Sequence, residues 1–523
     1  MREGLVASLV LGLAVGTLAV EPVARGVAQE LGSVLGGTAA DAGVGGGLPI
    51  SARTMVLTVL VPVLIGVAAT LLAWPTAWCL RSLGPGRGRW ALALLIVPMV
   101  LPTYLAFAGW GLARGPGTLV ALWMSRVPAL SALLGQVLAC VSLALWSWPI
   151  ATFVLLGPVG RVPRGEVEAL RLLGAGTVRG QWVLARRVQP AIVAAVALVA
   201  LLMLGSAVPL HLAQIDTLAI TLWAELALRP DGHGAWARAW PLLVVAVVAA
   251  VVLARSIGRG PLADVPGEEP VPARWRLGVP GVLAWTLGVA VPMACFALAV
   301  HSWPAAVRVW GESLGPLWES VLTGVCVGVG LVVLALCAWR CASSGGWAGV
   351  VARVALGCLA VMAVVPGVFT GVLIGASTSA QVAEVVLPGS VLPIVLGHLA
   401  RFGVLGVGAG MLLSAGEPMA LRDLRHQLAG GSVRGWLRLS VRPWAGVLVG
   451  LACAGGALSM HEIEATVQLR PPGTRPIAQI MLDNLHMNSL QELASTGVMV
   501  LLGTVVLAVL AGVLLAPRGV PRS

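Results

Sequence analysis

The sequence contains no lysine: all 33 basic residues of the 523-residue chain are arginine. A P-loop nucleotide site needs a phosphate-binding lysine, and a pyridoxal enzyme needs a Schiff-base lysine. The chain alone therefore has neither chemistry, and we expect it to bind no cofactor. If ATP hydrolysis drives its activity, a partner subunit must hydrolyse the ATP.

Motifs for metal, redox and nucleophilic chemistry are also missing. None of the eight cysteines belongs to a Cys-x-x-Cys pair, and the seven histidines form no His-Glu-x-x-His or comparable pattern. The cysteines lie almost entirely in apolar runs, where they behave as small hydrophobic residues. We therefore expect no metal site and no catalytic site, and an integral-membrane enzyme, which needs a cluster of such groups, is disfavoured.

Charged residues make up only 10% of the chain, whereas 58% of the residues are hydrophobic and the mean hydropathy is +0.96. Soluble proteins carry about 25% charged residues. This composition predicts an all-α integral membrane protein, whose spanning helices each need roughly 20 apolar residues. Twelve runs of this kind occur, at 5–20, 54–74, 91–112, 131–156, 191–208, 239–254, 278–300, 319–339, 354–374, 391–414, 444–460 and 495–516.

The distribution of arginine predicts how these runs are oriented. With the N-terminus inside, 23 of the 33 arginines fall in cytoplasmic segments, nine in outer segments and one, Arg401, within a span. Cytoplasmic loops of membrane proteins are enriched in positive charge, so we expect both termini in the cytoplasm. The run at 5–20 has a second interpretation, as a secretory signal peptide with Arg2 as its basic start.

The twelve runs divide into two sets of six around a polar, proline-rich stretch. This predicts a first half at 1–254, a cytoplasmic linker at 255–277 and a second half at 278–523. Equivalent loops of the two halves match, because Gly176-Thr-Val-Arg-Gly180 corresponds to Gly431-Ser-Val-Arg-Gly435 at an offset of 255 residues. A tryptophan and then a proline follow each pentapeptide.

The matching loops, 161–189 and 415–443, are the longest arginine-rich cytoplasmic segments. Their patterns suit short amphipathic helices on the membrane surface. Either these helices dock in the groove of a partner, or their arginines only anchor the loops to lipid headgroups. The residues concerned are Glu168, Ala169, Gly174, Gly176, Arg179 and Trp182 in the first loop and Asp423, Gly431, Arg434 and Trp436 in the second.

Glu168-Ala-Leu, followed after three further residues by Gly174, resembles the EAA loop of the permease subunits of binding-protein-dependent ABC importers. In that family the loop forms a coupling helix, which sits in a cleft of the cytoplasmic ATPase subunit. The second loop departs from the pattern, with Asp423-Leu-Arg and Ala429 at the corresponding positions. The resemblance therefore implies a strong first coupling helix and a degenerate second one.

Further segments are similar to the ferric-iron type permeases, which fuse two six-span units into one chain. These segments are Leu101-Pro-Thr-Tyr-Leu-Ala106, Val365-Pro-Gly-Val368, Arg401-Phe402, the segment from Ser459 to Thr466, Leu469-Arg-Pro-Pro-Gly473 and Leu485-His486. The resemblance implies the MetI-like fold of type I ABC importers in a bacterial inner membrane. It also implies two copies of an ATPase subunit and a periplasmic solute-binding protein as partners, with the lipid bilayer and without nucleic acid.

The solute that this resemblance implies is ferric iron, although thiamine, polyamine and phosphonate importers share the permease pattern. A secondary transporter with inverted repeats is the alternative from another class, and it predicts several acidic residues at midplane sites. The midspan positions of this chain are almost free of Asp and Glu. An ABC importer permease is therefore the favoured interpretation.

A few polar residues lie where they could gate or line a path, because charged groups in a bilayer usually face a cavity or a partner. Arg401 lies near the middle of its span, with His398 one turn earlier on the same face. Arg401 either lines the path or locks two helices through a carbonyl or a carboxylate. His461, Glu462 and Glu464 follow the eleventh span, and His461 and Glu464 are expected to share a helical face. We expect gating, or contact with a docked binding protein, in preference to metal ligation.

Overall fold

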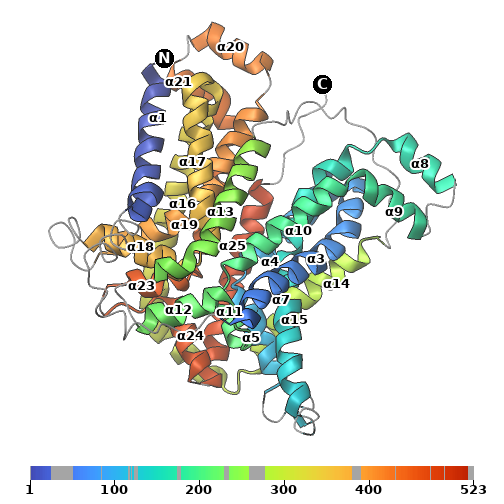
Figure 1. Cartoon of the computed structure of the whole chain (residues 1–523), viewed down its shortest axis with the longest axis vertical. Coiled ribbons are helices and arrows are strands. Elements are labelled where there is room, and N and C mark those ends of the chain that lie inside the picture. Colours follow the sequence, from blue (N-terminus) through green and yellow to red (C-terminus); the bar gives the residue numbers. More distant parts are fainter. Residues whose placement is uncertain are drawn as a thin grey trace.

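The computed structural model describes residues 2–24, 51–83, 85–115, 118, 121–122, 126, 128–172, 178–228, 235–257, 277–379, 390–417, 419–429, 432–471, 473–487 and 489–515. Every element of secondary structure in these ranges is a helix (Figure 1). Helices satisfy all backbone hydrogen bonds within one segment, which is what a lipid environment requires.

The first half contains α1 (Arg2–Val15), η1 (Gly16–Val20), α3 (Ala52–Ser82), α4 (Pro85–Val100), α5 (Thr103–Ala113), α7 (Pro128–Gly160), α8 (Arg164–Leu172), α9 (Val178–Arg187), α10 (Gln189–Leu204), α11 (Val208–Leu212), α12 (Leu218–Leu228) and α13 (Ala235–Ile257). The second half contains α14 (Val279–Trp285), η4 (Thr286–Ala290), α15 (Val291–Leu298), α16 (Trp303–Ser344), α17 (Gly346–Val364), α18 (Gly367–Ser379), α19 (Leu392–Ala415), α20 (Met419–Ala429), α21 (Val433–Trp436), η5 (Leu437–Val441), η6 (Arg442–Trp444), α22 (Ala445–Met460), α23 (Glu464–Leu469), α24 (Ile477–His486) and α25 (Leu490–Leu515).

Within the described ranges, nine helical segments are long and apolar enough to cross a membrane, or eleven if each of two bent pairs is one span. A shorter apolar helix covers Ala239–Val252. Apolar stripes face outward on these helices: Val325, Val329 and Val333 lie one turn apart on α16 and are 57%, 57% and 45% exposed. Such a stripe suits contact with lipid, and the chain is a multi-span membrane protein.

Two of the expected spans are not continuous. The run at 91–112 divides into α4 and α5, which meet at Pro102 with a bend of 80°. The run at 354–374 likewise divides into α17 and α18 at Pro366. Proline has no backbone N–H and disfavours helical geometry in the residue before it, so each helix ends there and a new one begins.

Helix boundaries in the two halves follow the same spacing as the matching loops. α7 ends at Gly160 and α19 at Ala415, which are 255 residues apart. The same offset relates the first residues of α8 and α20 and those of α9 and α21. A duplicated architecture predicts this agreement.

Packing between helices follows the same duplication. α3 packs on α7 and α10, and α16 packs on α19 and α22. Both α3 and α16 approach their partners closely at a glycine, because a Cβ on Gly66 or on Gly328 would lie 2.6 Å from the carbonyl oxygen of Val196 or of Ala452. The last spanning helix of each half packs on the other half: α13 packs on α17 of the second half, and α25 packs on α4 of the first.

Contacts between helix ends fall into two sets at opposite ends of the bundle. Arg89, at the start of α4, donates to the carbonyl oxygen of Val513, at the end of α25, at 3.0 Å. At the other end, the Trp310 indole N–H donates to the Ser495 carbonyl oxygen at 2.7 Å. Figure 1 places α8, α9, α20 and the start of α1 toward one end, and α5, α12, α15 and α24 toward the other.

Candidate functional site

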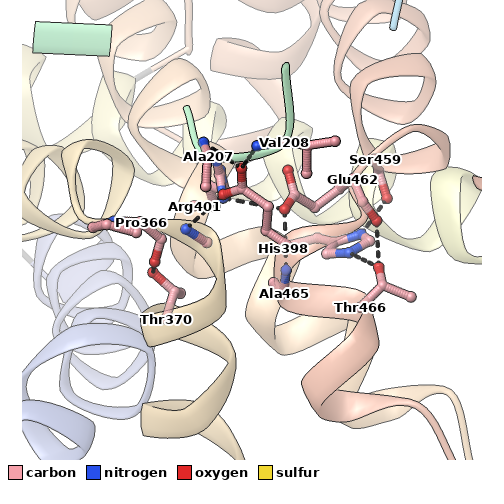
Figure 2. A network of polar contacts seen from close by, with 12 residues as sticks. Ala207, Val208, Pro366, Thr370, His398, Arg401, Ser459, Glu462, Ala465 and Thr466 are labelled. Atoms are coloured by element: carbon pink, nitrogen blue, oxygen red, sulfur yellow. Dashed lines mark hydrogen bonds and ion pairs between the residues drawn. The ribbon is translucent and has the colours of Figure 1, made fainter. Parts of the chain in front are cut away.

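Arg401 of α19 lies at the centre of a buried charged network (Figure 2). Its Nη1 donates to Glu462 Oε1 at 3.1 Å and to Glu464 Oε2 at 3.0 Å. The three side chains are only 16%, 8% and 7% exposed. Buried ions require partners for all of their polar atoms, so one arginine facing two carboxylates leaves an excess of negative charge to be stabilised.

Backbone N–H groups from both halves supply that stabilisation. Glu464 Oε1 accepts hydrogen bonds from the N–H groups of Ala207 at 2.9 Å and Val208 at 3.4 Å, and Oε2 accepts one from Gly367 at 3.0 Å. Ala207 and Val208 belong to the junction of α10 and α11 in the first half, whereas Gly367 opens α18 in the second. Hydrogen bonds to a charged acceptor are stronger than neutral ones. One carboxylate therefore joins the two halves.

Gly367 makes room for this arrangement. A Cβ at this position would lie 1.6 Å from Arg401 Nη1, so any other residue would displace the guanidinium. The glycine directly follows the proline break between α17 and α18. Sequence analysis identified the proline segment but missed the role of its glycine, for which the only signal is the Pro-Gly pair itself.

His398 faces the same side of α19 as Arg401, as expected. Its Nδ1 lies 2.7 Å from Ser459 Oγ, and its Nε2 lies 2.9 Å from Thr466 Oγ1. The Thr466 hydroxyl donates to the carbonyl oxygen of Glu462, so it accepts from His398. This assigns the proton of the neutral ring to Nε2 and leaves Nδ1 to accept from Ser459.

The expectation that His461 and Glu464 share a helical face is wrong. α22 ends at Met460 and α23 begins at Glu464, so His461 lies in the break between the two helices. Its Nε2 lies 2.6 Å from Thr504 Oγ1 of α25, and its Nδ1 is buried without a partner in the described part of the chain. Burial lowers the pKa of His461 to about 3, because the charged ring would lose its hydration.

A small, partly open cavity of about 20 Å³ adjoins the network. Its polar lining comes from Glu319, Ser320 and Thr323 of α16 and from His398, Ser459, Glu462, Thr466 and Thr474. A cavity of this size has room for about one water molecule, and the polar lining supplies the hydrogen bonds that such a water needs. The network thus extends from α19 and α23 to α16.

A second contact between the halves lies on the same end of the bundle. The exposed rings of His211 in α11 and His486 in α24 have centroids 6.2 Å apart. Burial lowers the pKa of His211, the neighbouring His486 lowers it further, and Asp216 opposes the shift. Sequence analysis singled out His486 by resemblance but did not single out His211, because nothing in the chain marks two residues so far apart as neighbours.

The first arginine-rich loop, at 161–189, forms two helices, α8 and α9, where one amphipathic helix was expected. Glu168 lies half-buried on α8, and its Oε1 pairs with Arg164 Nε at 2.7 Å. Ala169 is exposed. Gly174 and Gly176 lie outside the described residues. The EAA-like segment is therefore a helix that presents a polar surface.

The second loop forms α20 and α21 at the corresponding positions. Asp423 on α20 and Arg434 on α21 are exposed, as is expected of docking residues and equally of residues that face lipid headgroups. Gly431 lies outside the described residues, and Arg179 of the first loop lies within α9. The two loops thus have the same helical plan.

The two loop tryptophans have different surroundings. Trp182 is 54% exposed, and the Arg186 guanidinium carbon lies 3.8 Å from its ring centroid. Trp436 is 5% exposed and packs edge-on against Trp339 with centroids 5.7 Å apart, while Arg340 lies 5.8 Å from its ring. The first tryptophan is available to a partner, and the second holds its loop to the bundle.

The network has the chemistry of a lock between helices, because its charged and polar side chains bind one another and backbone N–H groups of both halves. The described residues contain no group of three or more His, Cys, Asp or Glu side chains placed to hold a metal ion. Comparison of the chain with protein-family models, with curated proteins and with solved structures finds no match.

Proposed function

We propose that the chain is the membrane-embedded permease subunit of an ATP-driven ABC importer, with twelve spans, both termini in the cytoplasm and ATP hydrolysis on separate subunits. The observation that carries the proposal is the duplicated pair of loop helices. α8–α9 and α20–α21 recur at an offset of 255 residues and lie toward the same end of the bundle (Figure 1). A partner with two equivalent binding surfaces would fit such a pair.

Coupling would be mechanical. α8 follows α7 after three residues, and α9 meets α10 at Val188 with a bend of 75°. A force on α8 and α9 would therefore be transmitted to α7 and α10, two helices that pack on each other and on α3. Trp182 and the Arg164–Glu168 pair provide the exposed surface on which an ATPase subunit would act.

The charged network would act as a latch at the opposite end. Its bonds from Glu464 to Ala207 and Val208 cross between the halves, and so does the contact of His211 with His486. Rocking of the halves would have to break these bonds before a solute could enter between them. The proposed resting state is therefore closed at the latch and opens when the ATPase subunits close.

Ferric iron is the proposed solute, on the resemblance of the Ser459 to Thr466 segment and its neighbours to iron permeases. Thiamine, polyamine and phosphonate importers remain the alternatives within the same class. Transport assays with a neighbouring solute-binding protein would distinguish these solutes, because the binding protein largely determines which solute is delivered.

A secondary transporter is the second candidate, and the buried carboxylates Glu462 and Glu464 favour it. An acid that couples to an ion gradient must change its protonation or its ion occupancy during the cycle. Here Arg401 and four backbone N–H groups, counting the bond from Ala465 to Glu462, already donate hydrogen bonds to the two acids. Uptake into proteoliposomes driven by a proton or sodium gradient without ATP would support this candidate and contradict the first.

The decisive experiment is co-purification and reconstitution with a candidate ATPase subunit. We expect the chain alone to hydrolyse no ATP and the complex to couple hydrolysis to uptake. Glu168→Arg should insert normally yet weaken coupling about tenfold or more, since the exposed Arg164–Glu168 pair contributes only about 0.3–0.5 kcal/mol to folding. Asp423→Arg is the matched control and should do less. ATP hydrolysis by the purified chain, or unchanged coupling in both variants, would refute the proposal.

A further inference from the structure

An open cavity of about 480 Å³ lies where α7 ends and α9 turns into α10. Its lining is apolar except for two arginines, and consists of Pro158, Arg161, Val162, Arg187, Val188, Pro190 and Ala191. None of the residues of the charged network around Arg401 lines this cavity. Its volume is in the range of ligand-binding pockets, which run from about 300 to 1,000 Å³.

The charge of the cavity is positive. Arg161 is exposed and forms no ion pair within the described part of the chain. Arg187 is 65% exposed, and Glu166, its carboxylate partner among the described residues, is 4.0 Å away, so this pair is weak. No acidic residue is among the described residues that line the cavity. Two guanidinium groups therefore line an opening whose described wall residues include no acid.

The wall beneath the arginines is held in place. Arg81, at the end of α3, donates to the carbonyl oxygens of Val159 at 2.8 Å and Val162 at 2.5 Å. These bonds fix the turn that carries Arg161 against α3. The cavity is thus part of the folded bundle, with its shape set before any ligand arrives.

The position of the cavity identifies the kind of anion. The apolar run of α7 ends at Gly160 and that of α10 begins after Gln189, so the cavity opens where both helices leave the hydrocarbon layer. The stacked pair of Trp182 and Arg186 lies on the adjoining helix α9, and tryptophan is enriched at this depth of a membrane. Lipid headgroups occupy the same layer.

We propose that this cavity is a binding site for one anionic phospholipid. The phosphate would lie between Arg161 and Arg187, which are suited to phosphate because the guanidinium group donates two parallel hydrogen bonds. The acyl chains would follow the apolar wall of Val162, Val188 and Ala191 toward the hydrocarbon layer. Basic pockets between membrane helices are known to hold phospholipid headgroups in this way.

The corresponding region of the second half differs, because an acidic residue replaces one of the apolar residues of the cavity wall. Glu417 corresponds to Val162 at the offset of 255, and its side chain is fully buried. Its Oε1 accepts a hydrogen bond from Ser440 at 2.5 Å, and its Oε2 lies 3.5 Å from Arg422 Nε. The second half therefore has a buried carboxylate, already paired, just after α19, where the first half has the apolar Val162 in the cavity wall. The lipid site is expected in the first half alone.

The test is native mass spectrometry of the full chain in detergent, titrated with phosphatidylglycerol or with phosphatidylcholine. We expect one phosphatidylglycerol molecule to bind more tightly than phosphatidylcholine. Arg161→Gln with Arg187→Gln should weaken that binding roughly 25-fold, at about fivefold per arginine. The matched control, Arg434→Gln with Arg442→Gln, removes the same charge from exposed positions of the second loop and should leave binding unchanged.

Three results would overturn the proposal. Equal affinity for the two lipids would show that charge does not select the ligand. Equal loss in both double variants would indicate diffuse attraction to all loop arginines. Displacement of the lipid by inorganic phosphate at millimolar concentration would identify a soluble anion as the ligand. Elution volume and circular dichroism establish that each variant is folded, which is expected because all four arginines are exposed.

Discussion

The two halves solve the same structural problem with different chemistry. In each half the third span is broken at a proline, and a side chain of the fourth span reaches that break. In the first half, Trp146 donates its indole N–H to the Leu101 carbonyl oxygen at 2.8 Å. In the second half the position 255 residues later is Arg401, which binds Glu462 and Glu464.

Of these two interactions at the proline breaks, only the charged network around Arg401 connects the halves. The bond from Trp146 to Leu101 stays within the first half and uses one neutral donor. The network around Arg401 continues through Glu464 to Ala207 and Val208 in the other half. In this network the second half therefore supplies all of the charged side chains, while the first half contributes only backbone donors.

The largest effect is expected from removal of the charged centre. Arg401→Ala leaves two buried carboxylates without their cation and should cost about 3–5 kcal/mol of stability. Trp146→Phe removes one neutral hydrogen bond and should cost about 1 kcal/mol. Apparent melting temperatures of the detergent-purified variants measure both. Similar small losses in the two variants would show that the charged network contributes no more to stability than the single neutral hydrogen bond of Trp146.

The loop tryptophans sharpen the same comparison. Trp436→Ala empties a buried site against Trp339 and should cost about 3 kcal/mol, at the lower end for a tryptophan, because its indole N–H has no partner within the described residues. Trp182→Ala alters an exposed side chain and should change stability by less than about 1 kcal/mol. Thermal unfolding distinguishes them. A larger loss for Trp182→Ala would contradict the assignment of a free surface to the first loop.

Gly367 and Thr103 test the two proline breaks directly. Each follows the break proline and begins a helix, α18 or α5. Gly367→Ala places a methyl group on Arg401 Nη1 and should cost about 1–3 kcal/mol through overpacking. Thr103→Ala should cost less than about 1 kcal/mol. The melting temperature of Gly367→Ala should fall less in an Arg401→Ala background, since the clash with the guanidinium is then gone and only the contact with Glu464 Cβ at 2.7 Å remains.

The smallest effect is a pH dependence of stability from His461 of the second half, whose counterpart in the first half does not titrate. The native pKa of His461, lowered to about 3, lies below that of an unfolded histidine at about 6.5, so the unfolded chain takes up the proton first as the pH falls. Stability from this group is full above about pH 6.5 and should drop by about 1 kcal/mol between pH 6.5 and 5.5.

The control for this pH dependence is His461→Gln, which keeps a polar side chain near Thr504 but does not titrate. Ser206 occupies the equivalent position of the first half and has no titration in this range. The difference in melting temperature between the wild type and His461→Gln should therefore vary with pH below about 6.5. A constant difference would show that the pKa of His461 is the same in the folded and the unfolded protein.

Sequence analysis predicted the helical class and the apolar segments well, because each depends on local properties. All twelve apolar runs coincide with helical segments in the structure. The continuous spans expected at 91–112 and 354–374 were wrong, although Pro102 and Pro366 were visible in the sequence. A proline within an apolar run can be tolerated, as Pro316 is within α16, so its presence alone does not predict a break.

The candidate site was predicted in its members but only partly in its geometry. His398 and Arg401 lie on one face of α19, which helical periodicity predicts. Glu464 was assigned to the same helical face as His461, and the end of α22 at Met460 separates them. Nothing local indicates that end, since the chain leaves the helix to satisfy partners on other helices.

The sequence by itself determined which segments are apolar and helical and which two loops are amphipathic, since hydropathy and its periodicity act within a few residues. The tertiary structure alone decided which of two matching tryptophans is buried and which residues pair with Glu464. The hydrogen bond from Ala207 to Glu464 joins positions 257 residues apart, and such a pair exists only after the two halves pack together. Duplication copied the helices, but each buried polar group had to find partners among whatever side chains the packing placed beside it.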